Sequence, residues 1–380
     1  MFFIIVLAIH TAVNFYIALR GWQALELNSG VRPWFITFMV LLYVAYPLAR
    51  ILEKIWYHPI PITLHWIGAF WFAAMLYVTL LLFLTDIIRV INHFTPFIHN
   101  ITENIATLKM KLFYAFSLIT LLVVVAGHIN AWTPKTTRLD IVIPKKAGNM
   151  ESLRIVAASD IHLGTLIGPR KTQKLVNQIN ALEPDIVLFA GDVIDEDVET
   201  VVKQDLGNCL KQINAPLGVY ASTGNHEYIG GAEPAVKYLE QHNINVIRDS
   251  ALLINNNFYI IGREDLHKRF TTGKSRKELN KIVADVDMSR PLILLDHQPY
   301  NLNDAIDAKI DLQISGHTHH GQLWPFGYIT NQIFEVSRGY AKFDNTHIYV
   351  SPGYGTWGPP VRTGNRPEIV MIQLYFDQPK

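Results

Sequence analysis

Apolar residues dominate the first third of the chain and form four long runs. These runs cover residues 2–19, 33–52, 63–85 and about 112–131. Each run approaches or exceeds the roughly 20 residues that a helix needs to cross a bilayer. Tryptophans lie near the ends of the runs, as interfacial anchors tend to: Trp22, Trp34, Trp56, Trp66 and Trp132. The pattern predicts a four-span transmembrane region over residues 1–132.

The first apolar run has a second interpretation, a secretory signal peptide. A signal peptide would need a basic N-terminal region and a cleavage site of small residues. No Lys or Arg precedes Arg20. We therefore expect residues 2–19 to remain in the chain as a membrane helix.

The connection between the third and fourth runs contains a possible helix start. Thr95-Pro96 is typical of an N-cap followed by proline in the first turn. Apolar residues then recur at helical spacing: Phe97, Ile101, Ile105 and Leu108. The spacing predicts either a short helix lying in the membrane interface or an ordinary connecting helix.

Beyond residue 132 the apolar pattern changes to short runs that alternate with amphipathic stretches. We expect strands at residues 153–158, 186–190, 218–222, 245–247, 252–254, 259–261, 292–295, 312–314, 348–350 and 369–376. We expect helices at residues 171–182, 198–213, 233–241 and 275–284. Strands separated by helices indicate an α/β fold. We assign residues 133–150 to a linker and first strand, with residues 133–137 as the polar linker, and residues 151–380 to the α/β domain.

The charge of the chain argues against a nucleic-acid partner, and its cysteine content excludes an internal disulfide bond. The 380 residues carry a formal net charge of +1, which argues against a nucleic-acid partner because such partners favour a basic excess. A single cysteine, Cys209, excludes an internal disulfide bond. We expect its thiol to be a packed, unreactive group.

Five polar motifs each come directly after a predicted strand. They are Asp160-Ile161-His162, Gly191-Asp192, Gly224-Asn225-His226-Glu227, Asp296-His297-Gln298-Pro299 and Gly316-His317-Thr318-His319. In open α/β sheets, ligands bind at the carboxyl ends of the strands, so these loops can converge on one site. Carboxylate, imidazole and amide oxygen together suit Mn, Fe or Zn better than Ca or a thiolate-bound metal. Seven candidate ligands are too many for one ion and predict two ions with a shared ligand.

The residue types also suggest separate roles within such a centre. Asp192 is our candidate for the shared ligand because a carboxylate has two oxygens. His226 adjoins a candidate ligand and can remain free to protonate a leaving oxygen. The glycines before Asp192, Asn225 and His317 allow tight turns and close backbone approach. For Asp195 and Glu227 the sequence leaves two readings open: orienting a ligand or facing solvent.

The ordered motifs resemble those of the calcineurin-like metallophosphoesterase superfamily, from residue 153 to about residue 320. Residues 355–362 and 365–369 are similar to the membrane-associated branch of that superfamily. This branch includes the YkuE and YaeI phosphoesterases and the animal transmembrane proteins with a metallophosphoesterase domain. The resemblance implies a four-layer αββα sandwich and makes residues 151–380 the catalytic domain.

The resemblance also implies a ligand set and a reaction. One metal would be held by Asp160, His162, Asp192 and His319. The other would be held by Asp192, Asn225, His297 and His317. Metal-bound hydroxide would attack phosphorus while His226 protonates the leaving group. No ligand position departs from the superfamily pattern.

From these observations we expect a membrane-anchored phosphoesterase that acts on a phosphodiester or phosphoanhydride. Lipid-linked substrates are candidates, and the diphosphate of UDP-2,3-diacylglucosamine, which some relatives cleave, is the named one. Arg362 and Arg366 are candidate phosphate contacts or simply surface charges. A non-hydrolytic membrane receptor or scaffold that retains the fold is the alternative from another class. A nuclease is a further rival, and the neutral charge argues against it.

The basic residues around the spans suggest an orientation in a bacterial inner or cytoplasmic membrane. Five lie in the first and third connections: Arg20, Arg32, Arg89, Lys109 and Lys111. Two lie in the second connection: Arg50 and Lys54. This excess favours cytoplasmic first and third connections and therefore an extracytoplasmic C-terminal domain. Four more basic residues follow the last span and favour the opposite orientation: Lys135, Arg138, Lys145 and Lys146.

Overall fold

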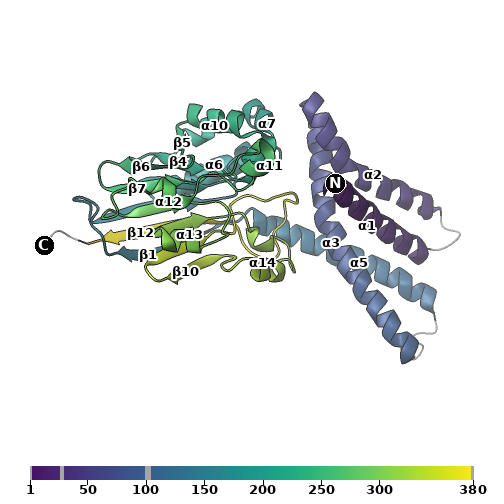
Figure 1. Ribbon diagram of the computed structural model, residues 1–380. Coiled ribbons are helices and arrows are strands. Elements are labelled where there is room, and N and C mark those ends of the chain that lie inside the picture. Colours follow the sequence, from purple (N-terminus) through teal and green to yellow (C-terminus); the bar gives the residue numbers. More distant parts are fainter. Residues whose placement is uncertain (1, 26–29, 99–103, 378–380) are drawn as a thin grey trace. The chain divides into compact units, whose positions relative to one another are not determined.

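The structure, a computed structural model, describes residues 2–25, 30–98 and 104–377 and divides the chain into two compact units (Figure 1). One unit contains Met1–Ile129 and Gly358–Val361. The other contains Asn130–Trp357 and Arg362–Lys380. The first is built from long helices and the second from two β-sheets with short helices.

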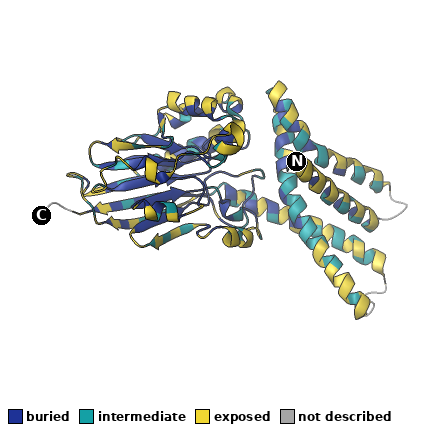
Figure 2. Cartoon of the chain, in the orientation of Figure 1, coloured by how far each residue is buried: buried dark blue, intermediate teal, exposed yellow. Residues whose placement is uncertain are grey.

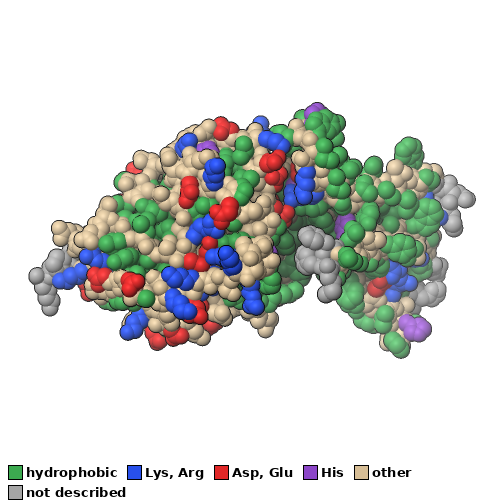
Figure 3. Space-filling model, turned by 45° about the horizontal axis from the view of Figure 1, so that its top comes forward, with side chains coloured by type: hydrophobic (Ala, Val, Ile, Leu, Met, Phe, Trp, Pro, Cys, Tyr) green, Lys and Arg blue, Asp and Glu red, His purple; other side chains and the backbone are tan. Residues whose placement is uncertain are grey.

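Four long apolar helices make up the helical unit. They are α1 (Phe2–Ala24), α2 (Val31–Ile55), α3 (Pro59–Phe94) and α5 (Ile105–Ala131). Each is long and apolar enough to cross a membrane, which confirms the four predicted runs. The helices extend beyond those runs, and α3 reaches 36 residues because polar residues at its end continue the helix. Large apolar side chains cover much of the visible surface of this unit (Figure 3), as a lipid environment requires.

Hydrogen bonds between polar side chains join three of these helices. His65 Nδ1 lies 2.9 Å from Glu53 Oε1, which joins α3 to α2. The indole of Trp71 on α3 donates to Asn14 Oδ1 on α1 at 2.9 Å. Polar groups within a bilayer need such partners because no water is available to them there.

The helix start expected at Thr95 is wrong. Thr95 instead ends α3, where it is the C-cap residue. The next helical residue is Ile98. The Asn92 side chain caps this helix start, because its Oδ1 accepts the backbone N–H of Phe97 at 2.9 Å and of Ile98 at 2.8 Å. The rest of the expected short helix, including Ile101, lies outside the described residues.

The α/β unit contains two six-stranded sheets. In spatial order the first sheet consists of β1 (Lys135–Ile143), β12 (Glu368–Phe376), β2 (Ser152–Ala158), β3 (Ile186–Ala190), β4 (Val219–Ser222) and β5 (Ile244–Val246). The second consists of β10 (Gly339–Phe343), β11 (Thr346–Val350), β9 (Leu312–Ser315), β8 (Leu292–Leu295), β7 (Phe258–Gly262) and β6 (Ser250–Ile254). β12 pairs in parallel with β1 and antiparallel with β2. The last strand of the chain therefore lies between the first two strands of this unit.

The sheets face each other across a largely apolar core. Alternate residues of each strand point to opposite faces, so Ile155 of β2 packs in this core whereas Val156 faces the outer helices. Helices α6 (Pro169–Asn180), α7 (Val198–Lys203), α8 (Leu206–Leu210) and α10 (Ala232–Gln241) cover the first sheet. Helices α12 (Leu279–Ile282) and α13 (Asn303–Asp307) cover the second. Figure 2 shows the buried strands, and the predicted four-layer αββα sandwich is confirmed.

Some predicted boundaries are wrong for local reasons. The helix expected over residues 198–213 is divided in two at Asp205, whose φ of 55° is left-handed. The expected linker over residues 133–137 is shorter, because β1 begins at Lys135. Within residues 275–284, only Leu279–Ile282 form a helix, α12. Short helices at Asn225–Gly230 (α9), Lys268–Thr272 (α11) and Gly327–Ile333 (α14), and strand β10, were not predicted.

Candidate metal centre

All seven candidate ligands follow the carboxyl ends of neighbouring strands, five on loops and two, Asn225 and His319, at the start of short helices. β2, β3 and β4 are parallel neighbours in the first sheet, and β8 and β9 are parallel neighbours in the second. Their ends therefore lie together, and backbone bonds join the loops. Asp160 N donates to Gly191 O at 3.2 Å, and Gly316 N donates to His297 O at 2.9 Å. The following residues meet there: Asp160, His162, Asp192, Asn225, His297, His317 and His319.

The backbone is left-handed at most of these positions. Five of the seven candidate ligands have a positive φ: Asp160 (49°), His162 (52°), Asp192 (49°), His317 (69°) and His319 (44°). Such a conformation is sparsely populated and costs on the order of 1–3 kcal/mol per residue. Strained residues of this kind cluster at functional sites, where the surrounding structure holds side chains in a required orientation. The strain here coincides with the candidate ligands.

Asp160, His162 and His319 form one group of facing ligand atoms. Their ligand atoms all lie within 4.8 Å of one another. The Nε2 atoms of His162 and His319 are 3.0 Å apart, and His319 Nε2 is 3.4 Å from Asp160 Oδ1. All three side chains are buried. Two imidazole nitrogens directed at each other beside a carboxylate are a donor set suited to a divalent ion.

Asp192, Asn225, His297 and His317 form a second, adjoining group. His297 Nε2 lies 3.1 Å from Asp192 Oδ2 and 3.2 Å from Asn225 Oδ1. His317 Nδ1 lies 2.8 Å from the same Asn225 oxygen. Asp192 Oδ2 is also 3.9 Å from His162 Nε2 of the first group. Asp192 is therefore adjacent to both groups, as a shared ligand would be.

The protonation states of three candidate ligands suit metal binding. Burial, together with the charge of His297, lowers the pKa of His317 to about 3. Burial and His162 hold the pKa of His319 well below its usual range. Burial alone would raise the pKa of Asp192, but the imidazoles of His297 and His226 lower it. Neutral imidazoles and a charged carboxylate are the forms that coordinate metals, so these three residues fit a metal centre. Burial alone would lower the pKa of His297, but the carboxylate of Asp192 raises it well above its usual range, so metal binding would displace a proton from this imidazole.

Glu227 joins the loops that follow β3 and β4. Its carboxylate accepts the backbone N–H groups of Asp192 at 3.1 Å, Ile194 at 2.9 Å and Gly224 at 2.7 Å. The side chain is buried. Of the two readings that the sequence left open, the structure shows the one in which Glu227 orients the loops and does not face solvent.

Asp195 faces two imidazoles of the site. Its Oδ1 lies 2.9 Å from His226 Nδ1 and 3.5 Å from His162 Nδ1. His226 also donates its backbone N–H to Asp192 Oδ1 at 2.8 Å. Burial alone would lower the pKa of His226, but the carboxylates of Asp192 and Asp195 raise it to about 10. The structure therefore places an imidazole with a raised pKa beside Asp195 and the candidate ligands.

The sequence of this unit matches known proteins. Residues 153–321 match the family described as calcineurin-like phosphoesterase. An uncharacterized metallophosphoesterase of Aquifex aeolicus is 33% identical over 251 residues, which cover 65% of this chain and 94% of that protein. The chain belongs to the metallophosphoesterase family. It is a metal-dependent phosphoesterase. Membership of this family favours an enzyme over the non-hydrolytic receptor or scaffold considered from the sequence.

Two further relatives of this metallophosphoesterase have more specific names. The transmembrane protein with metallophosphoesterase domain of Danio rerio is 29% identical over 327 residues, covering 82% of this chain and 74% of that protein. The UDP-2,3-diacylglucosamine pyrophosphatase LpxG of Chlamydia muridarum is 25% identical over 307 residues, covering 66% of this chain and 92% of that protein. Together with its four apolar helices, this similarity makes the metallophosphoesterase a membrane protein.

Two glycines of the metallophosphoesterase motifs make room for other ligands. A Cβ on Gly191, whose φ is +76°, would lie 2.6 Å from the ring of His297. A Cβ on Gly316 would lie 2.2 Å from Asp160 Oδ2. Real Cβ atoms essentially never come so close to other atoms. The expected close backbone approach is therefore present at both positions.

The two arginines considered as phosphate contacts have different environments. Arg362 is fully buried and donates from Nε and Nη2 to Gly355 O at 3.0 and 2.7 Å. Its Nη2 also lies 3.2 Å from His319 Nδ1. Arg366 is exposed, and its Nε donates to Thr133 O at 2.6 Å. The burial of Arg362 argues for a role in supporting the His319 loop and against direct contact with substrate.

Sequence reasoning gave no role to Trp357, which stands beside His226. The two ring centroids are 6.3 Å apart, and the indole is 59% exposed. Gln322 holds the Trp357 backbone by accepting its N–H at 2.9 Å and donating to its carbonyl at 3.1 Å. An exposed aromatic ring that is held next to a catalytic candidate can contact an organic part of a substrate.

Proposed function

We propose that this metallophosphoesterase is a binuclear enzyme whose two metal ions share Asp192. Asp160, His162, Asp192 and His319 would hold one ion. Asp192, Asn225, His297 and His317 would hold the other. The observation that carries the proposal is the position of Asp192 Oδ2, which adjoins the ligand atoms of both groups. Mn, Fe and Zn are the ions that this donor set suits.

When bound, two divalent ions supply positive charge for the phosphate oxygens and lower the pKa of water. The protein supplies the proton donor. The Nδ1 atom of His226 lies 2.9 Å from Asp195 Oδ1, which leaves Nε2 available to a leaving oxygen. Asp195 acts as a positioning residue because it fixes the orientation of this imidazole.

The substrate that we propose is a phosphodiester or phosphoanhydride carried on a lipid. Three observations support a lipid-linked substrate: the four apolar helices, the exposed Trp357 next to His226, and the similarity to a UDP-2,3-diacylglucosamine pyrophosphatase. A nucleotide diphosphate linked to an acylated sugar is the specific candidate. Trp357 would contact its organic part by stacking or by apolar contact.

A substrate panel tests this proposal. The purified full chain is stripped of metal, reloaded separately with Mn, Fe or Zn, and incubated with phosphomonoesters, aryl phosphodiesters and lipid diphosphates. We expect two ions per chain and the highest kcat/KM for a lipid diphosphate. The variant Trp357→Ala should raise KM for that lipid about 2–10-fold, the range that aromatic contacts give, and should change turnover of a small diester little.

Different results contradict different parts of the proposal. A single bound ion at full turnover would contradict the binuclear centre. Equal kcat/KM for small esters and lipid diphosphates would leave the centre intact and exclude the lipid-linked substrate. An effect of Trp357→Ala of the same size on every substrate would remove its role in recognition.

A further inference from the structure

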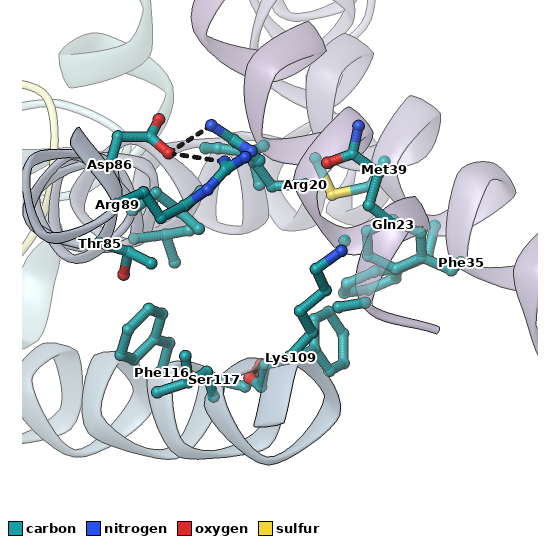
Figure 4. Close-up of a pocket in the computed structure, with 18 of the residues that line it drawn as sticks. Arg20, Gln23, Phe35, Met39, Thr85, Asp86, Arg89, Lys109, Phe116 and Ser117 are labelled. Atoms are coloured by element: carbon teal, nitrogen blue, oxygen red, sulfur yellow. Dashed lines mark hydrogen bonds and ion pairs between the residues drawn. The ribbon is translucent and has the colours of Figure 1, made fainter. Parts of the chain in front are cut away.

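The helical unit contains a cavity that the phosphoesterase chemistry does not use. Its volume is about 330 Å³, and all four long helices line it (Figure 4). Helix α5 approaches the other helices beside this cavity through Phe113, whose ring centroid is 5.7 Å from that of Phe35 on α2. The volume lies within the range of pockets that bind small ligands, about 300–1,000 Å³.

The cavity has an apolar wall and a basic end. Its apolar lining includes Phe38, Met39, Trp71, Val78, Leu82 and Phe116. Its charged lining consists of Arg20, Asp86, Arg89 and Lys109. A ligand that fits both parts must be amphiphilic.

The basic residues at this end outnumber the acidic ones. Arg20 and Arg89 both pair with Asp86, the latter from Nη1 to Oδ1 at 3.2 Å. Lys109 has no ion pair or hydrogen bond within the described part of the chain, and Figure 4 shows its side chain extending from α5 into the space between the helices. Among the described lining residues, three cations face one carboxylate, so two positive charges remain for an anionic ligand.

The basic end lies close to the ends of three helices. Arg20 and Lys109 are each four residues from a helix end, at Ala24 and Ile105 respectively. Arg89 is five residues from the end of α3 at Phe94. Basic pockets between transmembrane helices recognise anionic headgroups, whereas apolar helix surfaces contact the acyl chains.

We propose that this cavity binds an anionic phospholipid of the surrounding bilayer. One acyl chain lies against the wall that includes Trp71 and Phe116, and the phosphate lies against Lys109 and Arg89. Charge complementarity selects the anionic headgroup over a zwitterionic one of the same chain length. The site is independent of the catalytic residues of the α/β unit.

Lipid retention by the purified full chain tests the proposal. Delipidated protein in detergent receives dioleoyl phosphatidylglycerol or dioleoyl phosphatidylcholine. Native mass spectrometry measures retained lipid, and the unfolding midpoint measures stabilisation. We expect preferential retention of phosphatidylglycerol and a higher midpoint with it. The double variant Arg89→Gln/Lys109→Gln should weaken that retention by about tenfold, because each basic residue near a headgroup contributes to binding.

Two further variants distinguish lipid binding in the cavity from a general effect of surface charge. Lys54→Gln/Lys111→Gln removes the same charge outside the cavity and should retain phosphatidylglycerol as the wild type does. Ser117→Trp fills the cavity and should reduce retention of both lipids. Circular dichroism and gel filtration check that each variant is folded.

Three results would overturn the proposal. The first is equal retention of the two lipids by the wild type. The second is undiminished phosphatidylglycerol retention by Arg89→Gln/Lys109→Gln. The third is an equal loss with Lys54→Gln/Lys111→Gln, which would indicate a general surface-charge effect.

Discussion

At the scale of single residues, Asp192 lies beside imidazoles of both ligand groups. Its Oδ2 lies 3.1 Å from His297 Nε2 and 3.9 Å from His162 Nε2. We expect Asp192→Asn to weaken both metal sites, because the amide lacks the charge and the second equivalent oxygen of the carboxylate. Metal content should fall well below two ions per chain, as measured by inductively coupled plasma mass spectrometry.

The matched control for this change is Asp307→Asn, at an exposed position on α13. It removes the same charge and should leave metal content unchanged. Two ions and full turnover in Asp192→Asn would show that Asp192 is not the shared ligand.

His226 gives a prediction on the leaving group. We expect His226→Ala to retain its metal and to slow substrates with poor leaving groups by roughly 10²–10⁴, the usual range for a lost general acid. An aryl phosphodiester with an activated leaving group should be affected much less. The kcat values of the two substrates measure this difference. An equal loss for both would instead indicate that His226 positions the phosphate.

The sequence was sufficient to find the candidate ligands but not all the residues that support them. Asp160 and His162 were recognisable because a polar pair directly follows an apolar strand. Glu227 was ambiguous, because its partners are backbone N–H groups on another loop. Arg362 suggested a phosphate contact because sequence does not reveal that a charged side chain is fully buried. Long-range contacts decide such cases.

At the scale of elements, two lysines of α6 bind the backbone carbonyls of residues 131 and 132, where α5 ends. Lys171 Nζ donates to Ala131 O at 2.8 Å, and Lys174 Nζ donates to Trp132 O at 2.7 Å. Basic side chains near the C-terminal end of a helix can hydrogen-bond its last carbonyls and interact favourably with its dipole. Lys171 is almost completely buried, between the rings of Trp132 and Tyr354.

This contact predicts a pH dependence of stability. Burial, with smaller contributions from Arg362 and Lys174, lowers the pKa of Lys171 from 10.5 to about 7. Between these values the unfolded chain binds a proton that the folded chain does not, so stability increases as the pH rises through this window. Urea unfolding of the full chain in detergent at pH 7 and pH 9 should show a gain in unfolding free energy on the order of 2 kcal/mol.

The variant Lys171→Met should lose this gain, because methionine does not titrate. Lys203→Met, at an exposed position on α7, serves as the control and should keep it. The same pH dependence in Lys171→Met as in the wild type would contradict the assignment.

Strands and helices were predictable to different extents. Buried strands such as β3 and β8 were found with correct boundaries, because an uninterrupted apolar run defines them. The start of β1 was missed, because an edge strand with exposed Lys135 and Thr136 has the composition of a linker. The helix division at Asp205 depends on one left-handed residue, which the apolar pattern does not encode.

At the scale of the whole molecule, the basic residues predict which side of the membrane the α/β unit faces. We propose that residues from about 133 onward face outward, across a bacterial inner or cytoplasmic membrane. The basic residues of the first and third connections support this placement. The four basic residues that follow α5 are weaker evidence for the opposite orientation. Lys135 and Arg138 lie in β1, and Lys145 pairs with Asp311 at 2.7 Å. Charges within a folded domain have little influence on orientation.

Reporter fusions test the orientation. We expect a fusion after Lys135 to be active with a reporter that works only outside and silent with a fluorophore that works only inside. A fusion after Tyr57 should behave in the same way, and one after Gly30 should behave oppositely. Fluorescence without external activity after Lys135 would reverse the placement. It would also favour a nucleotide-linked glycolipid, because such lipids are made in the cytoplasm.

The position of β12 determines when the enzyme can mature during its synthesis. Residues 368–376 are translated after every other strand, yet they separate β1 from β2 in the first sheet. Chains grow at about 5–20 residues per second, so β1 remains unpaired for many seconds after its synthesis. We expect a chain that ends at Pro367 to insert its helices and to leave the α/β unit sensitive to limited proteolysis. A protease-resistant fragment from that chain would show that this unit can form before translation ends.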